Sequence, residues 1–278
     1  MARQMTPAEK QRFRGYFPNL DVNRAVVTGE VSTVYNCISW TVGVTNRLLW
    51  PGNSLANFDI FYRGFGFIRA GNGTIAAWGL STSNMTHGSV TGPGHGPRWE
   101  SKCGSDLRIQ HGLNELVSSS YGRVLAFYRR SGTLVAAYET TLEETMKEKT
   151  AKSYMSAAQK RTFHEERERV AEELRAAFDK AFAAWKNTWF SGGLAINSNP
   201  HSRVVGKEFD ALIALGPGIL PLVVEQMADP ENFLALQLYD ALQPNERLLV
   251  QFEPDDERIL EGEQGRAQRV VQAWFSNQ

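Results

Sequence analysis

The sequence predicts an α+β fold in which a mixed unit of helices and short strands is followed by an all-helical unit. Short apolar runs bounded by glycine recur between residues 74 and 129, which is typical of buried strands. From about residue 140 the chain is instead rich in Ala, Glu, Lys and Arg, which are strong helix formers. We therefore expect one domain over residues 1–140 and a second, helical domain over residues 141–278.

Three helices are expected before the strands begin. A Thr-Pro-Ala-Glu start provides a cap, a proline for the first helical position and a capping box, and predicts a helix over residues 6–14. An irregular stretch follows over residues 17–33. Asn36 can cap a short apolar helix that begins at Cys37, and residues 57–62 favour a short aromatic helix.

Apolar runs and turn residues predict the strands in order. We expect strands over residues 74–78, 86–91, 99–103, 106–111, 122–129 and 133–138. Glycine and proline fill five of the six positions of residues 92–97, so this segment is expected to be a loop between two of the strands.

The second half of the chain has the periodicity of helices. Apolar residues at spacings of three and four predict one face of a long helix that ends near Trp189; they are Val170, Leu174, Ala177, Phe178, Ala181, Phe182 and Trp185. Short helices are expected over residues 209–215, 219–227 and 233–242, a short strand over 248–252 and a final helix over 257–275. The segment Ala214–Val223 resembles the turn of HEAT-type helical repeats, which implies helix-on-helix stacking.

Composition narrows the classes of function. Thirty basic and thirty acidic residues cancel, so no overall field favours nucleic acid or a membrane surface as a partner. No apolar stretch is long enough to span a bilayer, and the first residues lack the apolar run of an ordinary signal peptide. We expect a cytoplasmic protein, or one exported without a classical signal peptide, that needs no cofactor.

The two cysteines, Cys37 and Cys103, form neither a disulfide framework nor a metal-binding CxxC pair. Cys37 is expected in the first turn of its helix, where unpaired N–H groups and the helix dipole favour negative charge and lower the pKa of a thiol. The alternative is a small buried core residue, since free cysteine is among the most buried residue types.

A nucleophilic cysteine needs a base within hydrogen-bond reach, and histidine is the usual base. Of the five histidines, His164 and His201 are expected to be ordinary solvated residues. The other three are His87, His95 and His111, which all fall in the same predicted domain as Cys37.

A capped cysteine at a helix start, followed by an apolar strand and then a strand that opens with histidine, resembles the papain-like hydrolases of the NlpC and CHAP amidase type. Tyr35-Asn36-Cys37 resembles their nucleophile segment, and Thr86–Val90 resembles their histidine strand. The resemblance covers about a hundred residues. Asn36–Trp40, with the later segment Trp99–Gly104, also resembles an uncharacterised bacterial and fungal family that implies no activity.

The papain-like resemblance implies acyl transfer on an amide bond of a peptide or protein substrate. Cys37 would attack the carbonyl carbon, and His87 would carry the proton from the thiol to the leaving amine. The backbone N–H of Cys37 and the side chain of Asn36 would stabilise the oxyanion. The third catalytic position would be Glu100, Asp106 or His111.

Four tryptophans could line an aromatic cleft that binds the substrate; they are Trp40, Trp50, Trp78 and Trp99, with Glu100 beside them. The alternative for these large aromatic side chains is plain core packing, which is their commoner role. For His87 the alternative is a hydrogen-bonded strand histidine without a catalytic role.

Two other hypotheses remain open. A metal site could draw ligands from His87, His95 and His111 with Glu100 or Asp106, although their spacing matches no established signature. The chain could also be a non-enzymatic protein-interaction module, with a HEAT-like helical half that binds a protein partner and with Cys37 in the core.

Overall fold

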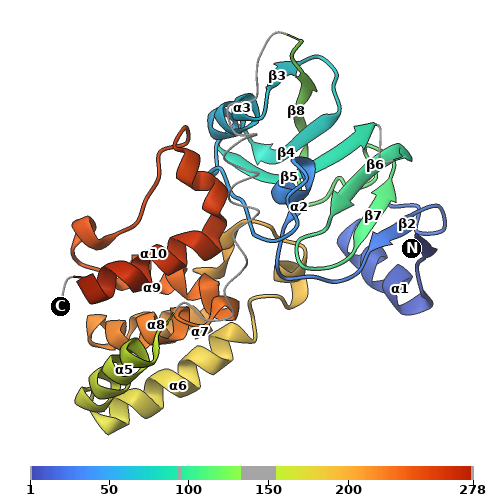
Figure 1. Cartoon of the computed structure of the whole chain (residues 1–278). Coiled ribbons are helices and arrows are strands. Elements are labelled where there is room, and N and C mark those ends of the chain that lie inside the picture. The colour runs from blue at the N-terminus through green and yellow to red at the C-terminus, as the bar shows by residue number, and fades with distance from the viewer. Residues whose placement is uncertain (1, 93–95, 133–154, 277–278) are drawn as a thin grey trace. The chain divides into compact units, whose positions relative to one another are not determined.

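The computed structural model describes residues 2–92, 96–132 and 155–276, which divide into two units (Figure 1). The first unit comprises Met1–Glu148, Gly192–Asn199 and Glu253–Leu260, and the second comprises Lys149–Ser191, Pro200–Phe252 and Glu261–Gln278. The chain combines helices with an antiparallel sheet and concentrates its helices toward the C-terminus, which confirms the α+β class. Two short segments of the expected helical domain therefore cluster with the first unit.

The described strands form one antiparallel sheet in the order β1-β2-β7-β6-β5-β4-β8-β3. Their bounds are Arg3–Gln4 (β1), Val26–Gly29 (β2), Phe67–Ala70 (β3), Ile75–Ser81 (β4), Asn84–Gly92 (β5), Gly96–Lys102 (β6), Arg108–His111 (β7) and Arg123–Arg130 (β8). The five strands expected between residues 74 and 129 are all present as β4 to β8. The strand expected over 133–138 lies outside the described residues.

The sequence analysis missed β1, β2 and β3. Each has four residues or fewer, a length at which an alternating apolar pattern is weak; β7 is equally short, and the sequence predicts it only within the longer segment 106–111. The strand predicted over residues 248–252 is wrong, since a 3-10 turn, η5, occupies Glu246–Leu248 and the residues after it join no ladder in the described sheet.

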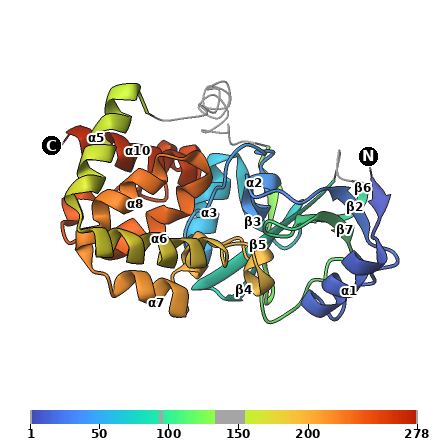
Figure 2. The same cartoon turned by 90° about the horizontal axis from the view of Figure 1, so that it is seen from below.

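Helices cover the two faces of the sheet. On one face α1 (Pro7–Tyr16) and the residue after it place Phe13 and Phe17 in a core that includes Trp78 and Ile109. On the other face lie α2 (Cys37–Thr41) and α3 (Leu55–Gly64). Figure 2 shows α1 and α2 on opposite sides of the strands. We refer to these as the α1 face and the α2 face.

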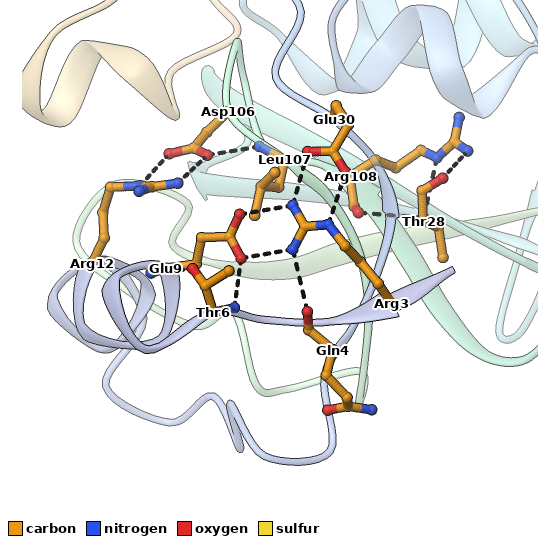
Figure 3. Close-up of polar contacts among 10 residues, drawn as sticks. All are labelled: Arg3, Gln4, Thr6, Glu9, Arg12, Thr28, Glu30, Asp106, Leu107 and Arg108. Atoms are coloured by element: carbon orange, nitrogen blue, oxygen red, sulfur yellow. Dashed lines mark hydrogen bonds and ion pairs between the residues drawn. The ribbon is translucent and has the colours of Figure 1, made fainter. Parts of the chain in front are cut away.

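Ion pairs fasten the N-terminal elements to the sheet (Figure 3). Arg3 in β1 donates to both carboxylate oxygens of Glu9 and of Glu30, each at 2.8 Å. Arg12 in α1 donates from Nε and Nη2 to the two carboxylate oxygens of Asp106, again at 2.8 Å each. Such bidentate pairs fix direction as well as distance, so they hold β1 and α1 in one orientation on the sheet.

The second unit is helical. Its helices are α5 (Ala157–Arg169), α6 (Glu172–Lys186), α7 (Lys207–Ile213), α8 (Leu220–Met227), α9 (Leu236–Leu242) and α10 (Gly262–Ser276), with 3-10 turns η2 (Pro200–Arg203), η3 (Pro217–Ile219) and η4 (Pro230–Ala235). The three short helices and the final helix expected from the sequence are present. Two further 3-10 turns, η1 (Gly192–Ala195) and η6 (Glu257–Glu261), lie mainly in segments of the first unit.

The long helix expected up to Trp189 is broken in the described residues. Val170 takes an extended conformation (φ −79°, ψ 135°), which ends α5, and α6 starts again at Glu172. The apolar face of the second segment is confirmed, because Phe178, Phe182 and Trp185 are buried. In the described part of the chain, every helix is too short or too polar to cross a membrane.

Candidate functional site

The helix that carries Cys37 begins as the sequence predicts. Asn36 caps it, because Oδ1 accepts from the Ser39 N–H at 2.9 Å and from the Ser39 hydroxyl at 2.8 Å. The Asn36 amide donates to the Leu49 carbonyl at 2.8 Å and the Ser198 carbonyl at 3.3 Å. Both hydrogens of this amide are thus committed to the backbone, so it is not directed at a substrate oxyanion.

Cys37 is completely buried. Burial raises the pKa of its thiol to about 11, despite hydrogen bonds from Ser198 and from the N–H groups of Gly88 and Ile38 that favour the thiolate. The Ile38 N–H at the helix start therefore lowers the thiol pKa as expected, but burial of the thiolate raises it by more. Near neutral pH this sulfur is a protonated thiol.

The sheet places His87 on the opposite face from Cys37. A Cβ built on Gly88 would meet Ile38, Thr41 and Tyr62, so residue 88 faces α2 and α3. Successive residues of a strand point to opposite faces. His87 accordingly points to the α1 face, where its ring stacks on Tyr121 with centroids 3.9 Å apart and planes 11° apart.

His87 and His111 share one hydroxyl on the α1 face. The Nε2 atoms of His87 and His111 lie 2.9 Å and 2.8 Å from Ser101 Oγ. Burial lowers the pKa of His111 to about 4, and burial followed by the proximity of His111 lowers the pKa of His87 well below its usual range. Both imidazoles are therefore neutral at pH 7.

The proton positions in this cluster follow from its acceptors. His111 Nδ1 contacts the Gly112 carbonyl at 2.8 Å and must donate to it, which leaves Nε2 of His111 to accept from Ser101. Ser101 Oγ then accepts from His87 Nε2–H. Nδ1 of His87 is left as a buried acceptor with no hydrogen-bond partner among the described residues.

Both carboxylates proposed as a third catalytic residue pair with arginine side chains. Glu100 accepts from the Thr28 hydroxyl and pairs with Arg108, each at 2.7 Å. Asp106 is held by Arg12 and also accepts from the Leu107 N–H (Figure 3). Each carboxylate has an arginine partner, which is the usual arrangement for a structural ion pair.

The tryptophans lie on both faces of the sheet and do not gather around one site. Trp78 is fully buried in the α1-face core, where its indole N–H donates to Ser89, and Trp99 packs against the same core. Trp40 belongs to α2. The guanidinium carbon of Arg108 lies over its ring, 3.8 Å from the ring centroid. Trp50 packs edge-on against Phe58 of α3.

The described residues provide no set of ligands for the metal site that the sequence left open. No group of three or more His, Cys, Asp and Glu side chains in that part of the chain could hold an ion. His87 and His111 both point at a serine hydroxyl, and His95 lies outside the described residues.

The sequence analysis missed Lys102, the most unusual charged residue of the unit. It is fully buried, and its ammonium group donates to the carbonyls of Ser32 at 3.0 Å, Gly104 at 2.7 Å and Asp106 at 2.6 Å. Burial lowers its pKa to about 8. With three carbonyls bound, Lys102 closes the β6–β7 turn, and no sequence signal distinguishes it from a solvated strand lysine.

Residues 26–129 match a family described as a domain of unknown function, DUF7689, and the match covers less than half of the chain. No curated protein matches the chain, and no solved structure does. The matched residues include α2, α3 and strands β2 to β7, and with them Cys37 and every described histidine of the first unit.

Proposed function

We propose that the chain is a non-enzymatic protein-interaction module in which Cys37 has a structural role. One observation carries this proposal: Cys37 is a fully buried, protonated thiol, and the nearest histidines along the sheet point to the other face. A cysteine nucleophile needs a thiolate and a base within hydrogen-bond reach. A buried thiol without either is inert.

The cysteine hydrolase and its papain-like fold stay predictions. In their favour, a capped helix starts at Cys37 and packs on an antiparallel sheet. Against them stand the position of His87 on the α1 face and the arginine partners of Glu100 and Asp106. The balance of these contacts supports the structural role for the sulfur.

The helical unit supplies the second part of the proposal. Within it α8 packs against α9 and α10, and its residues Leu222, Val223 and Val224 are fully buried. Helices stacked side by side are how repeat-type modules present surfaces to proteins. The HEAT-like segment Ala214–Val223 falls at the start of this group, which supports a protein as the partner.

Alkylation of the native protein tests the role of Cys37. We expect iodoacetamide to leave Cys37 unlabelled between about pH 5 and 8, and to label it once urea has unfolded the chain, because the native thiol is both covered and protonated. Peptide mapping by mass spectrometry separates Cys37 from Cys103. Rapid native labelling of Cys37 with an apparent pKa below that of a free thiol would contradict the proposal.

A Cys37→Ser variant supplies the matched control for activity. If the native protein cleaves peptide amides or activated esters and the variant does not, the chain is a cysteine hydrolase after all. We expect the two proteins to be equally inactive, since His87 and His111 both point to the face of the sheet opposite the sulfur.

A further inference from the structure

The segment Gly192–Asn199, here called the strap, belongs to the first unit although the chain on both sides of it belongs to the second. It follows α6 by a few residues and ends just before η2. The contacts of these eight residues explain why they cluster with the first unit.

The first unit binds the strap through its backbone carbonyls. The Ser105 N–H and hydroxyl both donate to the Ala195 carbonyl, at 2.7 and 2.9 Å. The Tyr121 hydroxyl donates to the Ile196 carbonyl at 2.8 Å, and the Asn36 amide donates to the Ser198 carbonyl. Recognition through carbonyls depends little on which side chains the bound segment carries, which is how many proteins bind extended peptides.

Two strap side chains are buried in the first unit. Ile196 is buried in the α1-face core, and Ser198 is buried beside Cys37 on the α2 side. The backbone approach is so close that Gly104 has no room for a side chain, because a Cβ there would lie 2.4 Å from the Ala195 carbonyl oxygen. The strap therefore places a small residue, Ala195, then an aliphatic one, Ile196, and two positions later a second small one, Ser198, against the first unit.

The residues that donate to the strap carbonyls or approach them most closely lie within residues 26–129, which match the domain family; they are Asn36, Gly104, Ser105 and Tyr121. The strap itself lies outside the match. The domain thus provides the donors, and another part of the chain provides the occupant.

We propose that Asn36, Gly104, Ser105 and Tyr121 form a peptide-binding site, which the strap occupies in the same molecule. Its ligand is a short peptide of the pattern Ala-Ile-x-Ser, held by its carbonyls and by the buried isoleucine. The inference rests on the proposed function, since it gives the interaction module a class of partner. A peptide that carries this pattern gains access when the strap leaves.

Peptide binding to a variant with a released strap tests the proposal. In the full chain, Ile196→Asp places a charge in the core and should displace the strap. We expect a fluorescein-labelled peptide with the sequence of residues 191–201 to bind this variant at least about tenfold more tightly than the wild type, as measured by fluorescence anisotropy. The same peptide with aspartate in place of isoleucine should not bind.

Two further variants keep the test decisive. Ile196→Ala loosens the strap without a buried charge and serves if the aspartate variant does not fold. Adding Tyr121→Phe to either variant removes one donor and should weaken peptide binding several-fold. Equal binding to wild type and variant, or no binding to any folded variant, would overturn the peptide site while leaving the alkylation result for Cys37 unaffected.

Discussion

In the histidine cluster a single buried hydroxyl links two neutral imidazoles. Ser101 donates to His111 and accepts from His87, which links the two rings and fixes their tautomers, while burial keeps both rings neutral. Arg98, whose charge acts on His111, pairs with Glu115 at 2.9 Å. Arg98 further disfavours a charge on His111.

Acid should therefore destabilise the first unit. The pKa of His111 is about 4 in the folded chain against 6.5 when unfolded, so the unfolded state binds more protons below pH 6.5 and stability falls as the pH falls. Between pH 6.5 and 4 we expect a loss of about 3 kcal/mol from this residue. His87, whose pKa is also lowered in the folded chain, should add to this loss of stability in acid. Urea unfolding curves collected between pH 7 and 4.5 measure the loss.

Two histidine variants show whether the cluster is the cause. His111→Gln removes the titrating group, and we expect the slope of the free energy of unfolding against pH to fall by about 1.4 kcal/mol per unit below pH 6. His164→Gln, at an exposed position of α5, is the control for replacing a histidine outside the cluster. An unchanged slope in the His111 variant would place the acid sensitivity elsewhere.

At the scale of elements, α1 depends on a cap that the sequence identifies. Thr6 accepts from the Glu9 N–H at 3.3 Å, and the Glu9 carboxylate accepts from the Thr6 N–H at 2.7 Å. We expect Thr6→Ala to cost about 1 kcal/mol, because the first turn loses its acceptor. Thr6→Ser keeps the hydroxyl and should cost only a few tenths. Hydrogen exchange of the α1 amides compares the two, and equal protection would contradict the role of the cap.

Element boundaries show where local signals were sufficient and where they were not. The caps of α1 and α2 and the apolar runs of β4 to β8 are encoded within a few residues, so the sequence predicts them correctly. The break at Val170 leaves no such signal, because a β-branched residue is tolerated within a helix and only the packing around it selects the extended conformation.

At the scale of the whole molecule, the first unit is completed by the strap, which the chain reaches only after α5 and α6 of the second unit. Ile196 contributes to the core of the first unit, although it stands more than sixty residues beyond β8, the last strand among the described residues. A chain that ends before the strap lacks this side chain and leaves the donors of Ser105 and Tyr121 without their carbonyls. Unpaired buried donors of this kind are costly.

Truncating the core side chain of the strap should show this dependence. We expect Ile196→Ala to lower the free energy of unfolding by about 2–4 kcal/mol, the usual cost of removing a buried aliphatic group. Val205→Ala, at a side chain that is 68 % exposed, should change it by no more than a few tenths. Urea unfolding of the two variants makes the comparison, and equal effects would mean that the strap adds little to the core.

The sequence by itself determined the α+β class, the capped starts of α1 and α2, the strands β4 to β8 and the position of Cys37 at a helix start, because each depends on residues close together in the chain. Only the tertiary structure decided on which face of the sheet each candidate residue lies, since a strand alternates its side chains and the register follows from the neighbouring strands. That alternation separates His87 from Cys37. It also took the fold to bring Ser198 to the sulfur and Arg12 to Asp106, because contacts across more than ninety residues leave no local pattern to recognise.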